Sequence, residues 1–97
     1  MPSYMVLYVG APTLPGASHE GWPEWFARRA DHVVHTGSPL ANGLALHADG
    51  STNGAAAHCN GYSIIQAEDI PDVLVLLKDH PYLTQGREYS IEVYLMP

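Results

Sequence analysis

The sequence predicts an α+β domain of the ferredoxin-like class, in which two helices cover one face of an antiparallel sheet. An apolar run at 4–10, rich in aromatic and β-branched residues, is typical of a strand. The segment 88–96 has the two-residue periodicity of another strand. Between them, 21–37 and 70–80 have apolar residues at helical spacing. These observations favour a β-α-β-β-α-β order.

The first helix is expected over 21–37. Pro23 suits a first helical turn, and Gly37 is well placed to end the helix. Residues three and four apart on a helix share a face, which gives this segment one apolar stripe. The expected buried stripe is Trp22, Phe26, Ala30 and Val33.

The middle of the chain, 38–60, is rich in glycine and small residues, and a short strand is expected at 44–48 with a turn at 49–54. A further strand is expected at 61–67. With the strands at either end of the chain, these segments complete the predicted order. At 97 residues the chain supports one core and therefore one domain, 1–97.

The second helix is expected to begin near Ile70, because Asp69 can cap it and Pro71 suits its first turn. Pro81 disfavours helical geometry at His80, so the helix should end about there. Its expected buried residues are Ile70, Val73, Leu74 and Leu77.

The first strand is apolar on both sides, although two helices can cover only one face of the sheet. The uncovered face should therefore form an apolar patch of roughly several hundred Å², the size that marks an interface. We expect the chain to form a homodimer through this face and to close a two-subunit barrel. The residues assigned to the uncovered face are Tyr4, Val6, Tyr8, Tyr94 and Met96.

The charge balance excludes one class of partner. Four basic residues stand against ten acidic ones, and no cluster of Lys or Arg is present, so nucleic acid binding is not expected. The single cysteine, Cys59, fits a reducing compartment. No signal sequence or membrane span is expected, and we interpret the protein as cytoplasmic. The stretch 10–21 lacks the lysine and the glycine spacing of a phosphate loop, and no cofactor is expected.

Four stretches, in this order and spacing, resemble the YCII-related family of small dimeric α/β-barrel proteins: "WPEWF" at 22–26, "GSPLANG" at 37–43, "NGYSIIQAEDI" at 60–70 and "HPYLTQGREYSIEVYLMP" at 80–97. The resemblance implies a ferredoxin-like subunit that pairs into a dimer. For members with an assigned role, it implies acid–base chemistry by a histidine and an aspartate on small carbonyl or muconate-like compounds. The nearest counterparts here are His19 and Asp31, at a different spacing from the family's pattern.

His80 is a further acid–base candidate, because it lies between the end of a helix and a proline. A helix C-terminus favours a protonated histidine, which would raise its pKa and suit a general acid. The alternative is a structural histidine that caps the exposed carbonyl groups. The candidate catalytic set is therefore His80, His19 and Asp31.

Aromatic side chains supply the candidate ligand-binding residues. Trp25 is expected to line a cleft between the first helix and the sheet, with Tyr8 as a second wall and Tyr62 nearby. Glu92 falls on the sheet face opposite its apolar neighbours. It is either paired, with Arg87, a tyrosine or the partner chain, or a buried carboxylate with a raised pKa that could act as a base.

A metal site is not expected. His32 and His35 are three residues apart, but His35 falls on the water-facing stripe of the predicted helix. His58 and Cys59 match no zinc spacing, and Cys59 is expected to be a small buried residue rather than a nucleophile.

Two functional hypotheses follow. In the first, the chain is an enzyme that transfers protons, in the manner of a lyase or isomerase; in the second, it is a non-catalytic ligand-binding or dimerisation module. An enzyme should bring two ionisable side chains within hydrogen-bond reach of each other in one pocket. A binding module should have an apolar pocket with isolated polar groups.

Overall fold

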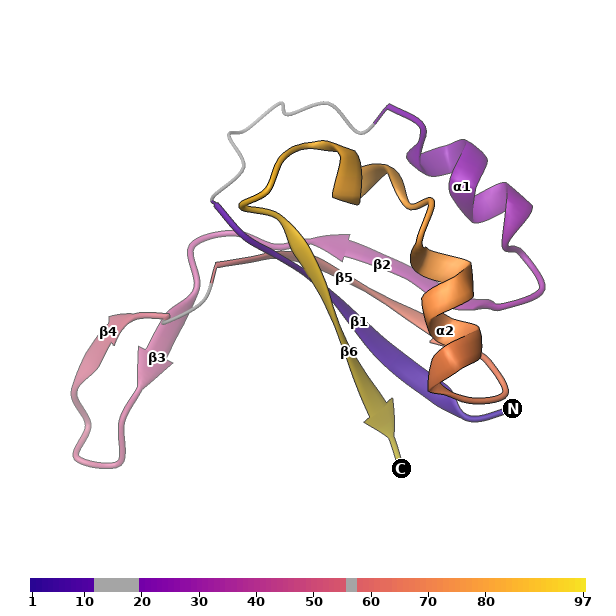
Figure 1. Ribbon diagram of the computed structural model, residues 1–97. Coiled ribbons are helices and arrows are strands. Elements are labelled where there is room, and N and C mark those ends of the chain that lie inside the picture. Colours follow the sequence, from indigo (N-terminus) through magenta and orange to yellow (C-terminus); the bar gives the residue numbers. More distant parts are fainter. Residues whose placement is uncertain (12–19, 56–57) are drawn as a thin grey trace.

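The computed structural model describes residues 1–11, 20–55 and 58–97 and has the expected α+β architecture (Figure 1). Its centre is a four-stranded sheet in the order β2-β5-β1-β6, in which each neighbouring pair is antiparallel. Two helices pack against one face of this sheet. The long elements are β1 (Ser3–Val9), α1 (Trp22–Arg28), β2 (Val33–Pro39), β5 (Cys59–Gln66), α2 (Ile70–Leu77) and β6 (Ser90–Met96).

The first helix is shorter than predicted. It ends at Arg28, and the expected helical residues from Val33 onward form the edge strand β2 instead. Two consecutive β-branched residues, Val33 and Val34, favour a strand, and pairing with β5 satisfies their backbone groups. Gly37 does not end a helix: it has a φ of 82° at an irregularity of β2 and packs against the backbone of β5. Ala30, expected to be buried, is exposed.

The second helix begins as predicted. The Asp69 carboxylate accepts a hydrogen bond of 2.9 Å from the Asp72 amide, and Pro71 lies in the first turn. The helix ends at Leu77, and a 3-10 helix, η1 (Pro81–Thr84), follows. Its buried face is shifted from the predicted one, because the side chains that pack on the sheet are Val73, Leu76 and Leu77, whereas Ile70 and Leu74 are exposed.

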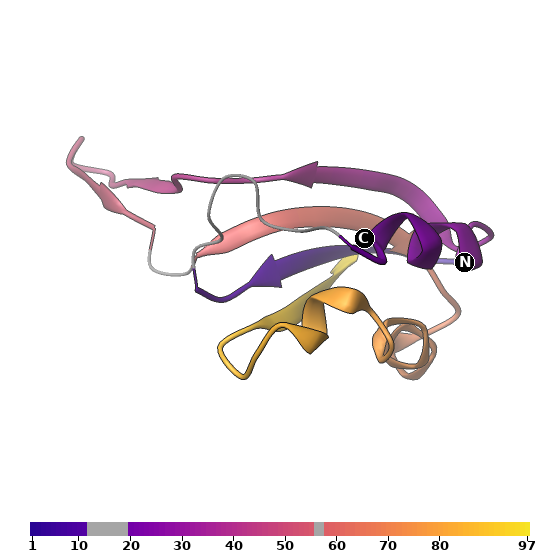
Figure 2. The ribbon, with the colours of Figure 1, turned by 90° about the horizontal axis from the view of Figure 1, so that it is seen from above.

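The centre of the chain forms a hairpin of β3 (Leu44–Leu46) and β4 (Thr52–Gly54), which we call the arm. A short strand is present within the expected 44–48, but it belongs to a separate two-stranded sheet; the second strand of the main sheet is β2 and not 44–48. The turn is tighter than expected, since Thr52–Gly54 pairs back on β3. The arm extends away from the main sheet in both views (Figures 1 and 2).

The faces of β1 are the reverse of those predicted. Tyr4, Val6 and Tyr8 are buried beneath the helices, and Met5 and Leu7 lie on the uncovered face. The β1–β6 register pairs Met5 with Tyr94 and Ser3 with Met96, so these two β6 residues are on the uncovered face, as expected. We call this uncovered side the open face; its apolar residues include Met5, Leu7, Ile64, Tyr94 and Met96.

The hydrophobic core lies between the sheet and the two helices and is formed mainly by residues of β1, β5, α1 and α2. Its members are Tyr4, Val6, Tyr8, Trp25, Ile65, Ala67, Val73, Leu76, Leu77 and Tyr82. Within the three described ranges, no helix has both the length and the apolar character needed to cross a membrane.

Candidate ligand pocket

A pocket of about 430 Å³ lies between α1 and one end of the sheet. Its size falls within the range of small-molecule sites, roughly 300–1,000 Å³. It is lined by Tyr8 from β1, by Trp22, Pro23 and Phe26 from α1, by Thr36, Gly37, Ser38 and Pro39 from β2, and by Asn60, Gly61 and Tyr62 from β5.

Aromatic rings form the apolar side of the pocket. The rings of Tyr8 and Trp22 meet edge to face with centroids 4.8 Å apart, and Phe26 follows Trp22 at 6.2 Å. Trp22 and Phe26 are four residues apart, so one helical face presents both. Aromatic rings offer broad, rigid surfaces on which a planar ligand can stack.

The sheet side of the pocket depends on two glycines. A Cβ on Gly37 would collide with the Tyr62 carbonyl group of the neighbouring strand. A Cβ on Gly61 would lie 3.1 Å from the Ser38 carbonyl oxygen and 3.4 Å from the Tyr8 ring. The absence of side chains at these two positions lets β2 and β5 approach each other closely beneath the pocket.

The Tyr8 hydroxyl belongs to a directed chain of hydrogen bonds. Ser63 Oγ donates to the Thr36 carbonyl oxygen at 2.7 Å, because a carbonyl can only accept. The 2.7 Å bond between Tyr8 and Ser63 therefore has the Tyr8 hydroxyl as its donor. Burial raises the pKa of Tyr8 to about 12. Tyr8 thus keeps its proton at neutral pH.

His80 lies behind the aromatic side of the pocket and is completely buried. Its Nδ1 accepts a hydrogen bond of 3.0 Å from the Tyr82 amide, which makes His80 the cap of η1. Because Nδ1 accepts, the proton of the neutral ring is on Nε2, and Nε2 has no hydrogen-bond partner among the described residues. The nearest ring centroids are those of Trp25 at 4.4 Å and Trp22 at 4.6 Å.

The environment of His80 lowers its pKa to about 4, mainly through burial, with the nearby Asp79 charge acting weakly in the opposite direction. The sequence led to the reverse expectation, a raised pKa at a helix C-terminus. The physical reason is that desolvation of the imidazolium outweighs any favourable charge at this position. His80 is therefore neutral at pH 7. Its role is structural, but it caps the Tyr82 amide at the start of η1 and not, as the structural alternative had it, the exposed carbonyl groups at the end of α2.

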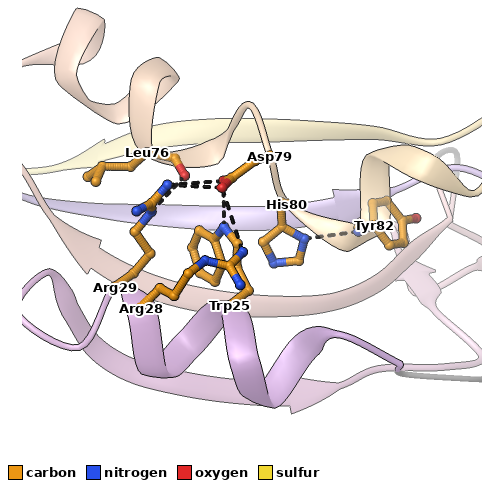
Figure 3. Close-up of polar contacts among 7 residues, drawn as sticks. All are labelled: Trp25, Arg28, Arg29, Leu76, Asp79, His80 and Tyr82. Atoms are coloured by element: carbon orange, nitrogen blue, oxygen red, sulfur yellow. Dashed lines mark hydrogen bonds and ion pairs between the residues drawn. The ribbon is translucent and has the colours of Figure 1, made fainter.

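Trp25 is in the core and not along the pocket, so the two tryptophans have exchanged their expected places. Only 1% of Trp25 is exposed, and its indole Nε1 donates to Asp79 Oδ1 at 3.0 Å (Figure 3). Arg29 binds both oxygens of the same carboxylate at 3.2 and 3.1 Å. The Trp25 hydrogen bond, followed by the Arg29 charge, keeps the pKa of Asp79 below its usual value.

The other candidates are dispersed. His19 lies outside the described residues. Asp31 is exposed and is not among the described lining residues; its backbone oxygen accepts a hydrogen bond of 3.2 Å from the Gln66 side-chain amide. Glu92 is exposed on the open face and accepts a hydrogen bond of 2.9 Å from the Tyr94 hydroxyl, which confirms the paired alternative with a tyrosine.

Of the four candidate ligand-binding residues, Tyr8 and Tyr62 line the pocket, and Trp25 and Glu92 do not. Tyr62 also stacks on His35, with ring centroids 6.3 Å apart. Within the described ranges, no group of three or more His, Cys, Asp or Glu side chains is arranged to hold a metal ion. Cys59 is half-buried and donates to the Gly61 carbonyl oxygen at 3.3 Å.

Sequence reasoning missed several lining residues. The spacing of Trp22 and Phe26 was visible, but it was interpreted as core packing alone. Thr36 was hidden by the prediction of a helix over 21–37, and Ser38 by its place in the glycine-rich segment that was expected to begin at 38; both are in β2. No pattern in the sequence identified Asn60 as a lining residue, because its position beside the pocket depends on the pairing of β5 with β2.

Comparison with known proteins finds no matching family model, no matching curated protein and no matching solved structure. The resemblance to the YCII-related family therefore remains a prediction from the sequence.

Proposed function

We propose that this protein is a non-catalytic module that binds a small organic molecule in the pocket beside α1. The observation that supports this function is the composition of the pocket, in which three aromatic rings and a proline face isolated polar groups. This is the pattern expected of a binding module. It differs from the paired ionisable groups expected of an acid–base enzyme.

The position of His80 argues against the alternative, a lyase-like or isomerase-like enzyme. A general acid must carry its proton near neutral pH and reach its substrate. A pKa of about 4 leaves His80 neutral. It packs against the lining residues Tyr8, Trp22 and Phe26 and is not itself among the described lining residues. Asp31 is exposed and is not among the described lining residues of the pocket.

We further propose that two copies pair through their open faces, each as a ferredoxin-like subunit of a dimeric α/β barrel in the cytoplasm. The order β2-β5-β1-β6 is compatible with that subunit. Support for pairing comes from the open face, where Met5 and Leu7 are partly exposed and Tyr94 is 53% exposed. Side chains of this kind gain free energy when a second sheet covers them.

A fragment screen followed by nuclear magnetic resonance tests the binding function. Ligands should shift the Trp22 indole and the Gly37 and Gly61 amide signals, and should leave the indole of Trp25 unchanged because it is sealed in the core. Binding should also raise the melting temperature by mass action.

Two matched variants locate the site. Thr36→Trp places a large ring in the pocket lining and should abolish the ligand shifts, whereas Thr52→Trp on the exposed arm should preserve them. A screen without hits, or hits that Thr36→Trp leaves intact, would contradict the proposed function.

A further inference from the structure

We infer that the pocket accepts an uncharged aromatic compound bearing its own N–H or O–H groups, and that it rejects carboxylates of the same shape. This inference rests on the proposed function, since it specifies the ligand class of the same pocket. Three independent properties of the lining lead to it: the location of the positive charges, the use of the hydrogen-bond donors, and the aromatic surface.

The positive charges of the chain are away from the pocket. The sequence has four Lys and Arg residues, of which Arg28 and Arg29 pair with Asp79, and Lys78 and Arg87 are not among the lining residues. The segments 12–19 and 56–57, which the structure does not describe, contain no Lys or Arg in their sequence. With a formal net charge of −6, the protein also repels anions at long range.

Three polar side chains of the lining use their hydrogen-bond donors within the protein. The Tyr8 hydroxyl donates to Ser63, and the Ser38 hydroxyl donates to the Pro39 carbonyl oxygen at 3.0 Å. Asn60 has two N–H bonds on Nδ2, and it donates to the Ala11 oxygen at 2.8 Å and to the Tyr82 hydroxyl at 3.0 Å.

The backbone follows the same rule at the irregularity of β2, where the Gly37 amide donates to His35 Nδ1 at 2.8 Å. Because the Tyr8 hydroxyl donates its proton to Ser63, its oxygen can offer a ligand only lone pairs. The hydroxyl of Thr36, also a lining residue, can accept as well as donate. The ring of Tyr62 alternates to the open face, where it pairs with Leu7 and stacks on His35.

A carboxylate bound in this pocket would lose its hydration. The described lining offers neither a cation nor a set of hydrogen-bond donors aimed at the ligand in exchange. Such burial is costly, because ionised groups need charge-assisted hydrogen bonds to replace water. An ammonium group is also disfavoured, since no Asp or Glu is among the described lining residues. A neutral ring compound can stack on Trp22 and Phe26 and donate its own protons to the oxygens of the lining.

A charge-matched panel tests the inference on the full chain. Phenyl, naphthyl and indolyl skeletons are each tested as the acetate, the acetamide and the ethylamine, at about pH 8, where an ordinary histidine is neutral. We expect the amide to bind at least about tenfold more tightly than the acetate of the same skeleton, and more tightly than the amine. Chemical shifts of the Gly37 and Gly61 amides locate the binding.

The variant Thr36→Lys reverses the electrostatic argument by adding a cation to the lining, and it should shift the preference toward the acetate. Thr52→Lys adds the same charge to the arm and should leave the preference for the amide over the acetate unchanged. Equal binding of acetate and amide, tightest binding of the amine, or no gain for the acetate in Thr36→Lys would each overturn the inference while leaving a functional pocket. If no member of the panel shifts the pocket signals, the proposed function itself fails.

Discussion

The indole Nε1 of Trp25 donates a hydrogen bond of 3.0 Å to Oδ1 of Asp79, a residue 54 positions later in the chain. The same carboxylate receives two hydrogen bonds from Arg29, whose Nε also donates to the Leu76 carbonyl oxygen at 3.3 Å. These contacts join the short helix α1 to the end of α2 (Figure 3). They also fix the helix that presents Trp22 to the pocket.

Replacing Asp79 with alanine should destabilise the protein by about 1–3 kcal/mol, because the buried indole N–H of Trp25 loses its acceptor. Chemical denaturation measures the free energy of unfolding. Asp31→Ala is the matched control, since Asp31 is exposed and its hydrogen bond to Gln66 uses the backbone oxygen, which alanine keeps. Equal stability of the two variants would show that the Trp25–Asp79 contact contributes little to stability.

The burial of His80 leads us to expect that the folded protein loses stability in mild acid. Its pKa is about 4 in the folded state and 6.5 ordinarily, so between these values the unfolded chain binds a proton that the folded chain does not. Stability from this residue is complete above about pH 6.5 and declines until about pH 4. The total loss should be roughly 3 kcal/mol, at 1.36 kcal/mol for each pH unit.

The variant His80→Asn isolates this effect, because the Asn Oδ1 can still accept from the Tyr82 amide but does not titrate. Unfolding free energies at pH 7.5 and 4.5 should differ less in the variant than in the natural protein. A pH dependence identical in both proteins would contradict the assignment to His80.

The sequence was informative wherever a local rule matched the final packing. Asp69 and Pro71 identified the start of α2, and the two-residue period of β6 was correct. The end of α1 was not predictable from spacing, because Val33 fits both a helical stripe and a strand, and pairing with β5 decides between them.

The site was harder to predict because it depends on which face of β1 is covered. Both faces of β1 are apolar, so alternation alone does not choose between them. In the structure, Tyr8 lies opposite Gly61 and reaches Ser63, and this arrangement places the tyrosine side beneath the helices. The environment of His80 was likewise set by rings brought together from distant segments.

Three glycine-to-alanine variants separate backbone strain from steric conflict. Gly50 and Gly37 both have positive φ, 87° and 82°, but only Gly37 has backbone within reach of an added Cβ. Gly50→Ala should cost about 1–2 kcal/mol from the left-handed conformation alone. Gly37→Ala should cost at least about 3 kcal/mol, because β2 and β5 must also separate.

Gly54→Ala is the control for this series, since a Cβ there meets nothing within 4 Å and its φ is not in the left-handed region. Its stability should stay within about 0.5 kcal/mol of the natural protein. If Gly37→Ala proved no more costly than Gly50→Ala, the close approach of β2 to the Tyr62 carbonyl group would not constrain the fold.

Replacing Leu7 with lysine should convert the proposed dimer into a monomer. Leu7 lies at the centre of the open face, paired with Tyr62 on β5 and Glu92 on β6, so a buried ammonium group there would oppose pairing of two sheets. Val6 is not suitable for this test, because it is fully buried beneath the helices and its replacement would disrupt the core.

Sedimentation at micromolar concentration should give twice the subunit mass for the natural protein and a single subunit mass for Leu7→Lys. Leu74→Lys is the control, since Leu74 is 59% exposed on the outer side of α2 and should leave the dimer intact. Circular dichroism should show that both variants remain folded. A natural protein that sediments as a monomer would disprove pairing through the open face, whereas a dimer that survives Leu7→Lys would place the interface on another surface.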